Sequence, residues 1–588
     1  MDAYGFYTGQ CFDAYEWLGA HVKGEQTVFR TFAPNASGVC LRYEQQEIPM
    51  MKVYDGNFYE TTVDRNLDGV CYEYRIYRRD GGYTDHCDPY GFGMELRPDH
   101  QSIVREQNTY EFHDDSWMRK RNTCEEEPLN IYEIHAGSWK KDGEQWYTYD
   151  LLGEQLIPYL KRYGYNYVEL MPIGEYPCDE SWGYQTTGFY APTSRYGTGD
   201  QLRKMIDTLH QHNIGVILDF VPVHFAVDSY GLGQYDGSAL YEYPNYDVGV
   251  SEWGSYNFMH SRGEVRSFLQ SCANYWLKEY HFDGLRMDAI SRIIYWNGEE
   301  RRGVNGNALD FIKVMNQGVK ERNRGCMLIA EDSTNFPNVT KPVEQGGLGF
   351  DYKWDMGWMH DTLSYFQTGP GYRTENYHKL TFSMMYHYQE RYLLPLSHDE
   401  VVHGKATILQ KMYGQYEGKF PQGRAFYLYM MVHPGKKLNF MGNEFGQLRE
   451  WDERREQDWL LFEYPIHRAF SDYMKELNQL YQSHPALYEK DCEQEGFCWL
   501  DCHQESRCIY ALLRKGKRER LAAVFNFSDQ PQSDYQVDIP DGGQGKELLY
   551  TDWKEFGGNT PKEQQIAVLE NGTLICSLAP FSGILLQL

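Results

Sequence analysis

Short apolar segments alternate with amphipathic helical stretches across the middle of this chain, and this alternation constrains the fold more than any other feature. Strands that alternate with helices favour βα units and a parallel sheet. Eight segments are predicted to be strands: 129–135, 165–172, 214–222, 282–289, 326–333, 348–355, 392–400 and 437–445. Eight such units predict a (β/α)8 TIM barrel with enlarged loops. The alternative is a doubly wound open sheet, which is disfavoured because no G-x-G-x-x-G motif follows the first strand.

Two of the helical stretches carry apolar residues at helical spacing. In 200–213 they recur at i, i+3, i+4 and i+7 and predict one buried face. In 261–280, Ser261 and Glu264 predict an S-x-x-E capping box at the start of the helix. The predicted buried positions of the two helices are Leu202, Met205, Ile206 and Leu209, then Val265, Phe268, Leu269, Cys272 and Trp276.

The two flanks of this region have a different pattern. Residues 1–112 contain short strands separated by turn signals such as Asp55-Gly56, and residues 479–588 return to the same pattern. Each flank is therefore predicted to be a β-sandwich. We expect three domains: an N-terminal β-sandwich over 1–112, the barrel over 113–478 and a C-terminal β-sandwich over 479–588.

Charge and cysteine content restrict the partners and the compartment. The formal net charge of −27 repels phosphate backbones and anionic lipids, so neither a nucleic acid nor a membrane is expected as a partner. The first residues show neither the basic nor the apolar region of a secretory signal, and the 13 cysteines are scattered. A reduced, cytoplasmic protein is therefore expected. The denser group Cys492, Cys498, Cys502 and Cys508 is interpreted as strand fillers, with a zinc site as the weaker alternative.

Charged side chains follow four of the predicted strands. The apolar run of the third strand finishes at Asp219, with His224 just beyond, and the end of the fourth strand carries Arg286 and Asp288. The fifth strand ends at Glu331, and the seventh is followed by His398 and Asp399. Barrel enzymes build their active sites at the carboxyl ends of the strands. One such acid could simply cap a helix, but four strands with the same pattern indicate a functional site.

Clustered carboxylates could bind a metal or cleave a glycosidic bond. Arg286, two residues before Asp288, opposes a cation there. An arginine suits a carboxylate that must stay ionised, so Arg286 is expected to lower the pKa of Asp288, while Glu331 stays protonated and donates to a leaving oxygen. Two acids whose pKa values are pushed apart are typical of retaining glycoside chemistry.

The same residues carry a family resemblance. The segments DFVPVH, GLRMDAI, IAEDS and LSHDEVVHGK, in this order, resemble the four signature regions of the α-amylase superfamily. Longer blocks, including YEIHAGSW and KKLNFMGNEFGQLREW, are similar to the bacterial-type 1,4-α-glucan branching enzymes of that superfamily. YEWLGAH and FRTFAPNASGV resemble the carbohydrate-binding module that precedes such barrels. The resemblance extends over essentially the whole chain.

The resemblance implies a role for each candidate residue. Asp288 would be the nucleophile that forms a covalent glucosyl-enzyme, Glu331 the general acid and then base, and Asp399 the residue that binds and distorts the donor sugar. Five further residues would bind the substrate or support the site. Arg286 would hold Asp288 ionised, and Asp219 would steady the site. Tyr184 would stack on the donor sugar, and His224 and His398 would bind the same ring. The 6-hydroxyl of another glucan would then attack the intermediate and create an α-1,6 branch.

Several alternatives remain open at this point. An α-glucan hydrolase of amylase or debranching type would use the same residues, and a glycan-binding scaffold with a dead site is a third possibility. Tyr184 could be a core aromatic, and both histidines could be structural. Many hydrolases of the superfamily carry a calcium-ligating Asn before the first His, but Val223 stands there. We therefore expect no metal and no cofactor, an α-glucan as partner, and a monomer or weak oligomer.

Overall fold

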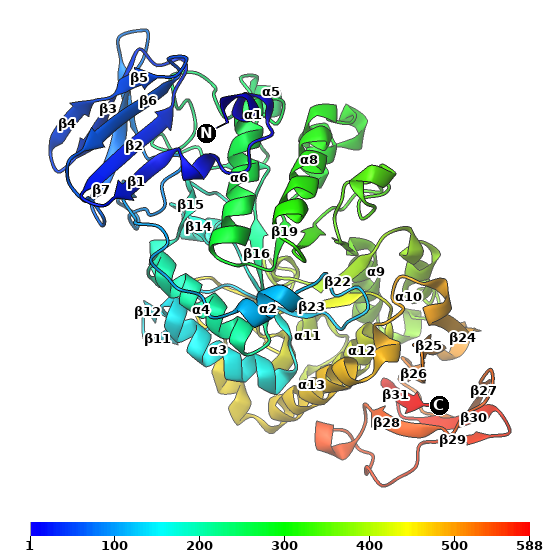
Figure 1. The fold of residues 1–588 in the computed structure, drawn as a ribbon. Coiled ribbons are helices and arrows are strands. Elements are labelled where there is room, and N and C mark those ends of the chain that lie inside the picture. Colours follow the sequence, from blue (N-terminus) through cyan, green and yellow to red (C-terminus); the bar gives the residue numbers. More distant parts are fainter. Residues whose placement is uncertain (1) are drawn as a thin grey trace. The chain divides into compact units, whose positions relative to one another are not determined.

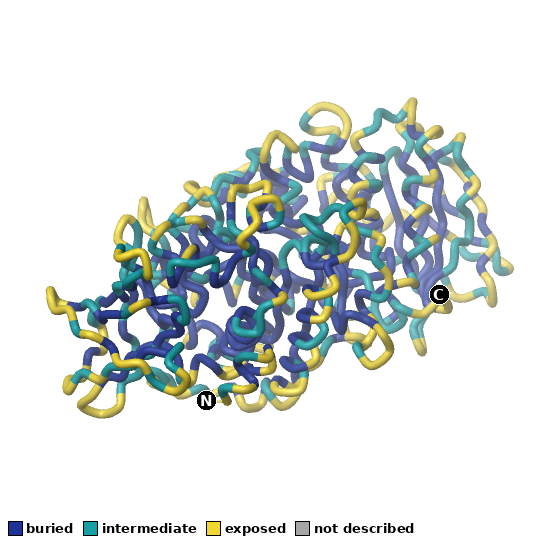
Figure 2. The backbone as a smooth tube through the Cα atoms, turned by 90° about the horizontal axis from the view of Figure 1, so that it is seen from above, coloured by how far each residue is buried: buried dark blue, intermediate teal, exposed yellow. Residues whose placement is uncertain are grey.

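The computed structural model describes residues 2–588, and its central element is a closed parallel barrel. All eight strands predicted from the sequence form it, which confirms the (β/α)8 fold (Figure 1). The strands, in barrel order, are β10 (Asn130–Ile134), β13 (Tyr167–Leu170), β16 (Gly215–Phe220), β19 (Gly284–Met287), β20 (Met327–Ala330), β21 (Tyr352–Trp354), β22 (Tyr392–Leu396) and β23 (Lys436–Phe440). Figure 2 shows the exposed residues mainly in the outer loops, while the barrel strands are almost wholly buried. This burial on both faces explains their continuous apolar runs.

Helices follow the barrel strands as predicted. The longer ones are α3 (Tyr149–Tyr163), α4 (Gly199–Gln211), α6 (Gly263–Glu279), α8 (Gly306–Arg322), α9 (Met356–Gln367), α12 (Tyr416–Val432) and α13 (Pro465–Ser483). Every apolar position predicted to be buried on α4 and α6 is buried. A complete capping box is present on α4, where Thr198 and Gln201 exchange hydrogen bonds.

The capping box predicted for Ser261 and Glu264 is wrong. Helix α6 begins at Gly263, its N-cap is Arg262, and no side chain caps it. The reason is a contact with the N-terminal helix α1 (Ala3–Thr8). A Cβ added to Gly263 would lie 1.8 Å from the carbonyl oxygen of Tyr7, so the backbone of the preceding module occupies the space beside the helix start.

The N-terminal flank consists of two antiparallel sheets, as expected for a β-sandwich. One sheet has the order β1-β2-β6-β5 and the other β4-β3-β7-β8, with β9 paired to β7. The strands are β1 (Gly19–Lys23), β2 (Gln26–Phe32), β3 (Gly38–Tyr43), β4 (Gln46–Pro49), β5 (Met51–Val53), β6 (Phe58–Val63), β7 (Cys71–Tyr77), β8 (Tyr83–His86) and β9 (Ser102–Ile103). A cluster of buried rings, Phe6, Phe32 and Phe58, fills the space beside the first sheet.

The C-terminal flank is also all-β. A five-stranded sheet has the order β24-β25-β26-β31-β28, and a three-stranded sheet has the order β27-β30-β29. The strands are β24 (Phe497–Gln504), β25 (Ile509–Lys515), β26 (Arg520–Asn526), β27 (Gln532–Asp538), β28 (Lys546–Tyr550), β29 (Ala567–Glu570), β30 (Thr573–Leu578) and β31 (Ser582–Gln587). Cys498 and Cys502 lie on β24 and are half-buried, Cys508 is buried just before β25, and Cys492 lies outside the strands.

The chain divides into two compact units. One comprises the residues up to 123 with 135–157 and 169–351, and the other 124–134, 158–168 and 352–588. Both units contribute strands to the barrel. The three domain ranges expected from the sequence, 1–112, 113–478 and 479–588, stay a prediction.

A buried ion cluster fixes the connector that follows the N-terminal sheets. Asp114, at the start of α2 (Asp115–Lys120), lies 2.7 Å from Nδ1 of His210, whose Nε2 lies 2.8 Å from Asp283. Burial opposes the charged imidazole, but the two carboxylates outweigh it and raise the pKa of His210 to about 9. The imidazolium therefore ties the connector to helix α4 and to the residue before β19.

All 13 cysteines are free thiols. Within residues 2–588, no helix combines the length and the apolar character that crossing a bilayer requires.

Candidate active site

The site is centred on Arg286, the second-last residue of strand β19. Arg286 and Asp288 are two residues apart, so their side chains leave the extended backbone on the same side. Asp219 on β16 is in register with Arg286. Nη1 of Arg286 donates to both carboxylate oxygens of Asp219 at 2.7 Å and to Oδ1 of Asp288 at 2.9 Å. The strand pairing thus brings together three residues that the sequence predicted for the site.

Glu331 joins this cluster from the end of β20. Nη2 of Arg286 donates to Oε2 of Glu331 at 2.8 Å, and the backbone N–H of Ala289 donates to the same oxygen at 3.0 Å. Ala289 has a φ of 51°, in the left-handed region that a residue with a Cβ rarely adopts. The turn after Asp288 therefore holds a strained backbone that directs an N–H to the second carboxylate.

The charges at this point are unbalanced. One guanidinium contacts three carboxyl groups, and the Arg286 side chain is fully buried. Burial raises the pKa of Asp288 well above its ordinary range, and the neighbouring Glu331 and Asp219 raise it further, although Arg286 lowers it. Arg286 lowers the pKa of Asp288, as expected, but burial and the two neighbouring acids outweigh it, because one cation is shared among three acids.

Tyr184 reaches the cluster from the loop between β14 (Gly174–Glu175) and β15 (Gly188–Pro192). Its hydroxyl donates to Asp219, and the ring centre lies 6.0 Å from Cζ of Arg286. The preceding turn needs Gly183, whose φ is 94° and whose added Cβ would lie 2.5 Å from the carbonyl oxygen of Pro172. Tyr184 is thus a partly buried residue of the site rather than a core aromatic.

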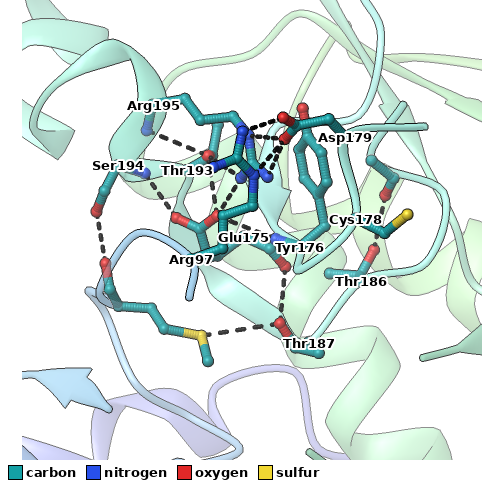
Figure 3. Close-up of polar contacts among 12 residues, drawn as sticks. Arg97, Glu175, Tyr176, Cys178, Asp179, Thr186, Thr187, Thr193, Ser194 and Arg195 are labelled. Carbon is teal, nitrogen blue, oxygen red and sulfur yellow. Dashed lines mark hydrogen bonds and ion pairs between the residues drawn. The ribbon is translucent and has the colours of Figure 1, made fainter. Parts of the chain in front are cut away.

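A buried network holds the base of the Tyr184 loop (Figure 3). Arg195 donates to Glu175 at 2.6 Å and to Asp179 at 2.5 Å, and its guanidinium stacks over the Tyr176 ring at 3.8 Å. Nε of Arg97, from the segment between β8 and β9, donates to Asp179 at 3.0 Å. The loop that carries Tyr184 is therefore tied down on both sides.

His224, on β17 (His224–Phe225), is 3% exposed. Burial, together with the nearby Arg292, lowers its pKa to about 4, so the ring is neutral at pH 7. Its Nδ1 has no hydrogen-bond partner among residues 2–588. A buried polar atom without a partner is costly in a folded protein and is typical of a site that binds a ligand.

His398 and Asp399 follow β22 in the other compact unit and form their own cluster. Nδ1 of His398 lies 2.5 Å from Oε1 of Glu133 on β10, and its backbone N–H donates to Oε2 at 3.0 Å. Nε2 lies 3.5 Å from Oδ1 of Asp399. Because a carboxylate only accepts hydrogen bonds, Glu133 holds the proton of His398 on Nδ1.

Glu133 is a residue that the sequence reasoning missed. It lies inside an apolar strand rather than after one, and its side chain is fully buried. A carboxylate in the middle of a buried strand is the signal that could have found it, since a buried charge needs a partner.

No group of three or more His, Cys, Asp or Glu side chains in the described part of the chain is arranged to hold a metal ion. Tyr184, Asp219, Arg286, Asp288 and Glu331 form one hydrogen-bonded cluster. Two carboxyl groups on one buried guanidinium can support acid–base and nucleophilic chemistry on an uncharged substrate.

Comparison with known families agrees with this architecture. The family "Alpha amylase, catalytic domain" matches residues 108–238 and 251–507. The family "alpha-1,4-glucan branching enzyme GlgB, N-terminal domain" matches residues 4–90, and "Alpha amylase, C-terminal all-beta domain" matches residues 499–588.

Individual proteins are similar over nearly the whole chain. The 1,4-alpha-glucan branching enzyme GlgB of Bacillus caldolyticus is 44% identical over 95% of this chain and 86% of its own. That of Geobacillus stearothermophilus is 43% identical over 95% of this chain and 90% of its own. A pullulanase of Anoxybacillus sp. LM18-11, solved with maltotetraose, has the same fold, with a TM-score of 0.74 and 17% identity over 100% of this chain and 89% of its own. The chain belongs to the family of 1,4-alpha-glucan branching enzymes GlgB, whose catalytic domain is that of the alpha-amylases.

Proposed function

We propose that this chain is a 1,4-α-glucan branching enzyme that cleaves an α-1,4 bond and transfers the released chain to a glucan 6-hydroxyl, forming an α-1,6 branch. The family membership supports this proposal. The observation that carries it within the site is the guanidinium of Arg286, which bonds to both Asp288 and Glu331. Two carboxyl groups held side by side are what a retaining mechanism uses.

In the first step, a carboxylate oxygen of Asp288 attacks C1 of the donor sugar. The bond from C1 to the leaving O4 breaks, and Glu331 gives its proton to that oxygen. In the second step, Glu331 takes the proton of the acceptor 6-hydroxyl, whose oxygen attacks C1 and releases Asp288. The shared contact with Arg286 supports this division of roles, because it holds the nucleophile and the proton donor close together.

The other residues hold the donor sugar in this proposal. Tyr184 provides a ring against the sugar, and Asp219 steadies both Tyr184 and Arg286. His224 and His398 are proposed to bind sugar hydroxyls, which is supported by the partnerless Nδ1 of His224 and the Glu133-held ring of His398. Asp399, whose side chain is 40% exposed, is proposed to bind two hydroxyls of the same ring.

The substrate is proposed to be an α-glucan such as amylose or glycogen, which is neutral and therefore insensitive to the charge of −27. The enzyme is proposed to work in the cytoplasm as a monomer or weak oligomer. The 13 free thiols support a reducing compartment.

The test is to incubate the enzyme with amylose and to follow the iodine complex and the reducing ends together. Branching lowers the iodine colour while reducing ends stay constant, and a debranching enzyme added afterwards releases short chains. The Asp288→Ala variant is the control and should change neither signal. Reducing ends that rise in step with the colour loss would show hydrolysis and refute the proposal.

A further inference from the structure

Trp253 lies next to the site, on the loop between α5 (Tyr246–Gly249) and β18 (Tyr256–Asn257). It is 48% exposed, although an indole is among the most costly side chains to leave in water. Its carbonyl oxygen accepts from Nε2 of Gln185 at 3.4 Å, and Gln185 directly follows Tyr184. The backbone of the Trp253 loop is thus joined to the loop that enters the active site.

The indole is held in place from one side. Cζ of Arg292, on α7 (Ser291–Ile294), lies 4.4 Å from the ring centre of Trp253. The guanidinium is anchored by Glu252, whose Oε1 lies 2.6 Å from Nη2. A cation over an aromatic ring attracts and restrains the ring, and almost half of the indole surface still faces solvent. An orientation fixed before binding lowers the entropy cost of binding a ligand.

The ring also borders His224. The two ring centres are 5.3 Å apart, with 42° between the planes. Nδ1 of His224 is the buried atom that has no partner among residues 2–588. A flat apolar surface beside a polar atom that seeks a hydrogen bond matches a pyranose, which presents C–H groups on its faces and hydroxyls at its edge.

We propose that Trp253 is a glucan-binding residue that stacks on a glucose unit next to the one held by Tyr184 and His224. The ligand is an α-1,4-glucan segment, so the proposal rests on the proposed function for its ligand class but not for the transfer step. Trp253 acts on binding rather than on bond cleavage, because no contact joins it to Asp288 or Glu331 in the described structure. Its loss therefore raises KM and leaves kcat largely unchanged.

The test compares Trp253→Leu, which keeps apolar bulk but removes the flat ring, with Trp253→Tyr, which keeps a ring. Binding of maltoheptaose is measured by calorimetry in the Asp288→Asn background, where turnover cannot interfere. Trp253→Leu should weaken binding about three- to tenfold, and Trp253→Tyr should retain most of it. Tyr246→Ala is the control, since Tyr246 is 79% exposed on the neighbouring helix α5, and this variant should bind as the parent does. Equal affinity of the Leu and Tyr variants with the parent would overturn the proposal.

A second measurement needs no substitution at Trp253. Oxidation of its indole by N-bromosuccinimide, read by peptide mass spectrometry, should slow when maltoheptaose is present, and an unchanged rate would contradict the stacking. This readout also separates the two proposals. If the enzyme hydrolysed amylose instead of branching it, maltoheptaose should still protect Trp253 from oxidation. If the enzyme branched amylose but maltoheptaose did not protect Trp253, only the role of Trp253 would be overturned.

Discussion

Nη1 of Arg286 donates to Oδ1 of Asp288 at 2.9 Å, across a spacing of two residues at the end of one barrel strand. The same guanidinium also contacts Asp219 and Glu331. The proposed nucleophile, Asp288, is therefore held in place by a cation that it shares with two other carboxyl groups. This arrangement orients Asp288 firmly but leaves its charge only partly compensated.

The first prediction concerns pH. Asp288 must be ionised to attack, and burial with the neighbouring acids Glu331 and Asp219 raises its pKa. Activity is therefore lost as pH falls through that raised pKa, so the acid limb of kcat/KM lies above the range of an ordinary Asp. Asp219→Asn removes a negative neighbour and should move the limb toward lower pH, besides lowering the maximum rate. A limb at the same or higher pH would contradict the shared-cation explanation.

Glu133→Gln tests the partner of His398. An amide cannot replace a carboxylate as acceptor for both Nδ1 and the backbone N–H of His398. Loss of one charged hydrogen bond should lower kcat/KM by about ten- to a hundredfold while the fold is retained. Steady-state kinetics on amylose measure the effect. Glu344→Gln, at an exposed position, serves as control, and equal activity of the two variants would show that Glu133 does not position His398.

Arg195→Met tests the network beneath the Tyr184 loop. The change leaves the buried Glu175 without its guanidinium, while the partly buried Asp179 keeps only Arg97. Removing one partner of a buried ion pair costs about 3–5 kcal/mol, so thermal unfolding should shift clearly downward. KM should rise as well, because Tyr184 loses its support. Arg301→Met, at a side chain that is 84% exposed, should leave both measurements unchanged.

His210→Gln tests the buried cluster that fixes the connector. The folded pKa of His210 is about 9 and its ordinary value is 6.5, so its stabilisation is complete below about 6.5 and is lost as pH rises through 9. At pH 6 the variant should be less stable than the parent by about 3 kcal/mol or more. The difference, measured by urea unfolding, should shrink above pH 9. A difference that does not depend on pH would show that His210 is not charged in the folded protein, and His503→Gln at an exposed position is the control.

Much of the fold follows from local patterns, and the exceptions depend on distant contacts. The eight barrel strands could be predicted because each is a short apolar run separated from the next by a helical stretch or a loop. The start of α6 could not, because the backbone at Tyr7 decides where that helix begins. Ser261 therefore precedes the N-cap instead of capping the helix.

The candidate site shows the same division. Their positions at strand ends predicted Asp219, Arg286, Asp288 and Glu331. The register of the paired strands brings the three acids onto the guanidinium of Arg286. The pKa of Asp288 could not be predicted, because it depends on how many acids share that cation in three dimensions. Trp253 escaped notice since its loop has no periodic pattern.

The most direct measurement is proton NMR of amylose treated with the enzyme, because it counts α-1,4 and α-1,6 anomeric protons and reducing ends in one spectrum. The parent enzyme should convert α-1,4 into α-1,6 signals one for one, without new reducing ends. Asp288→Asn should slow this conversion by about 10⁴-fold or more, while Asp310→Asn at an exposed position should not. Growth of reducing-end signals without α-1,6 signals, or undiminished conversion by Asp288→Asn, would contradict branching with Asp288 as nucleophile.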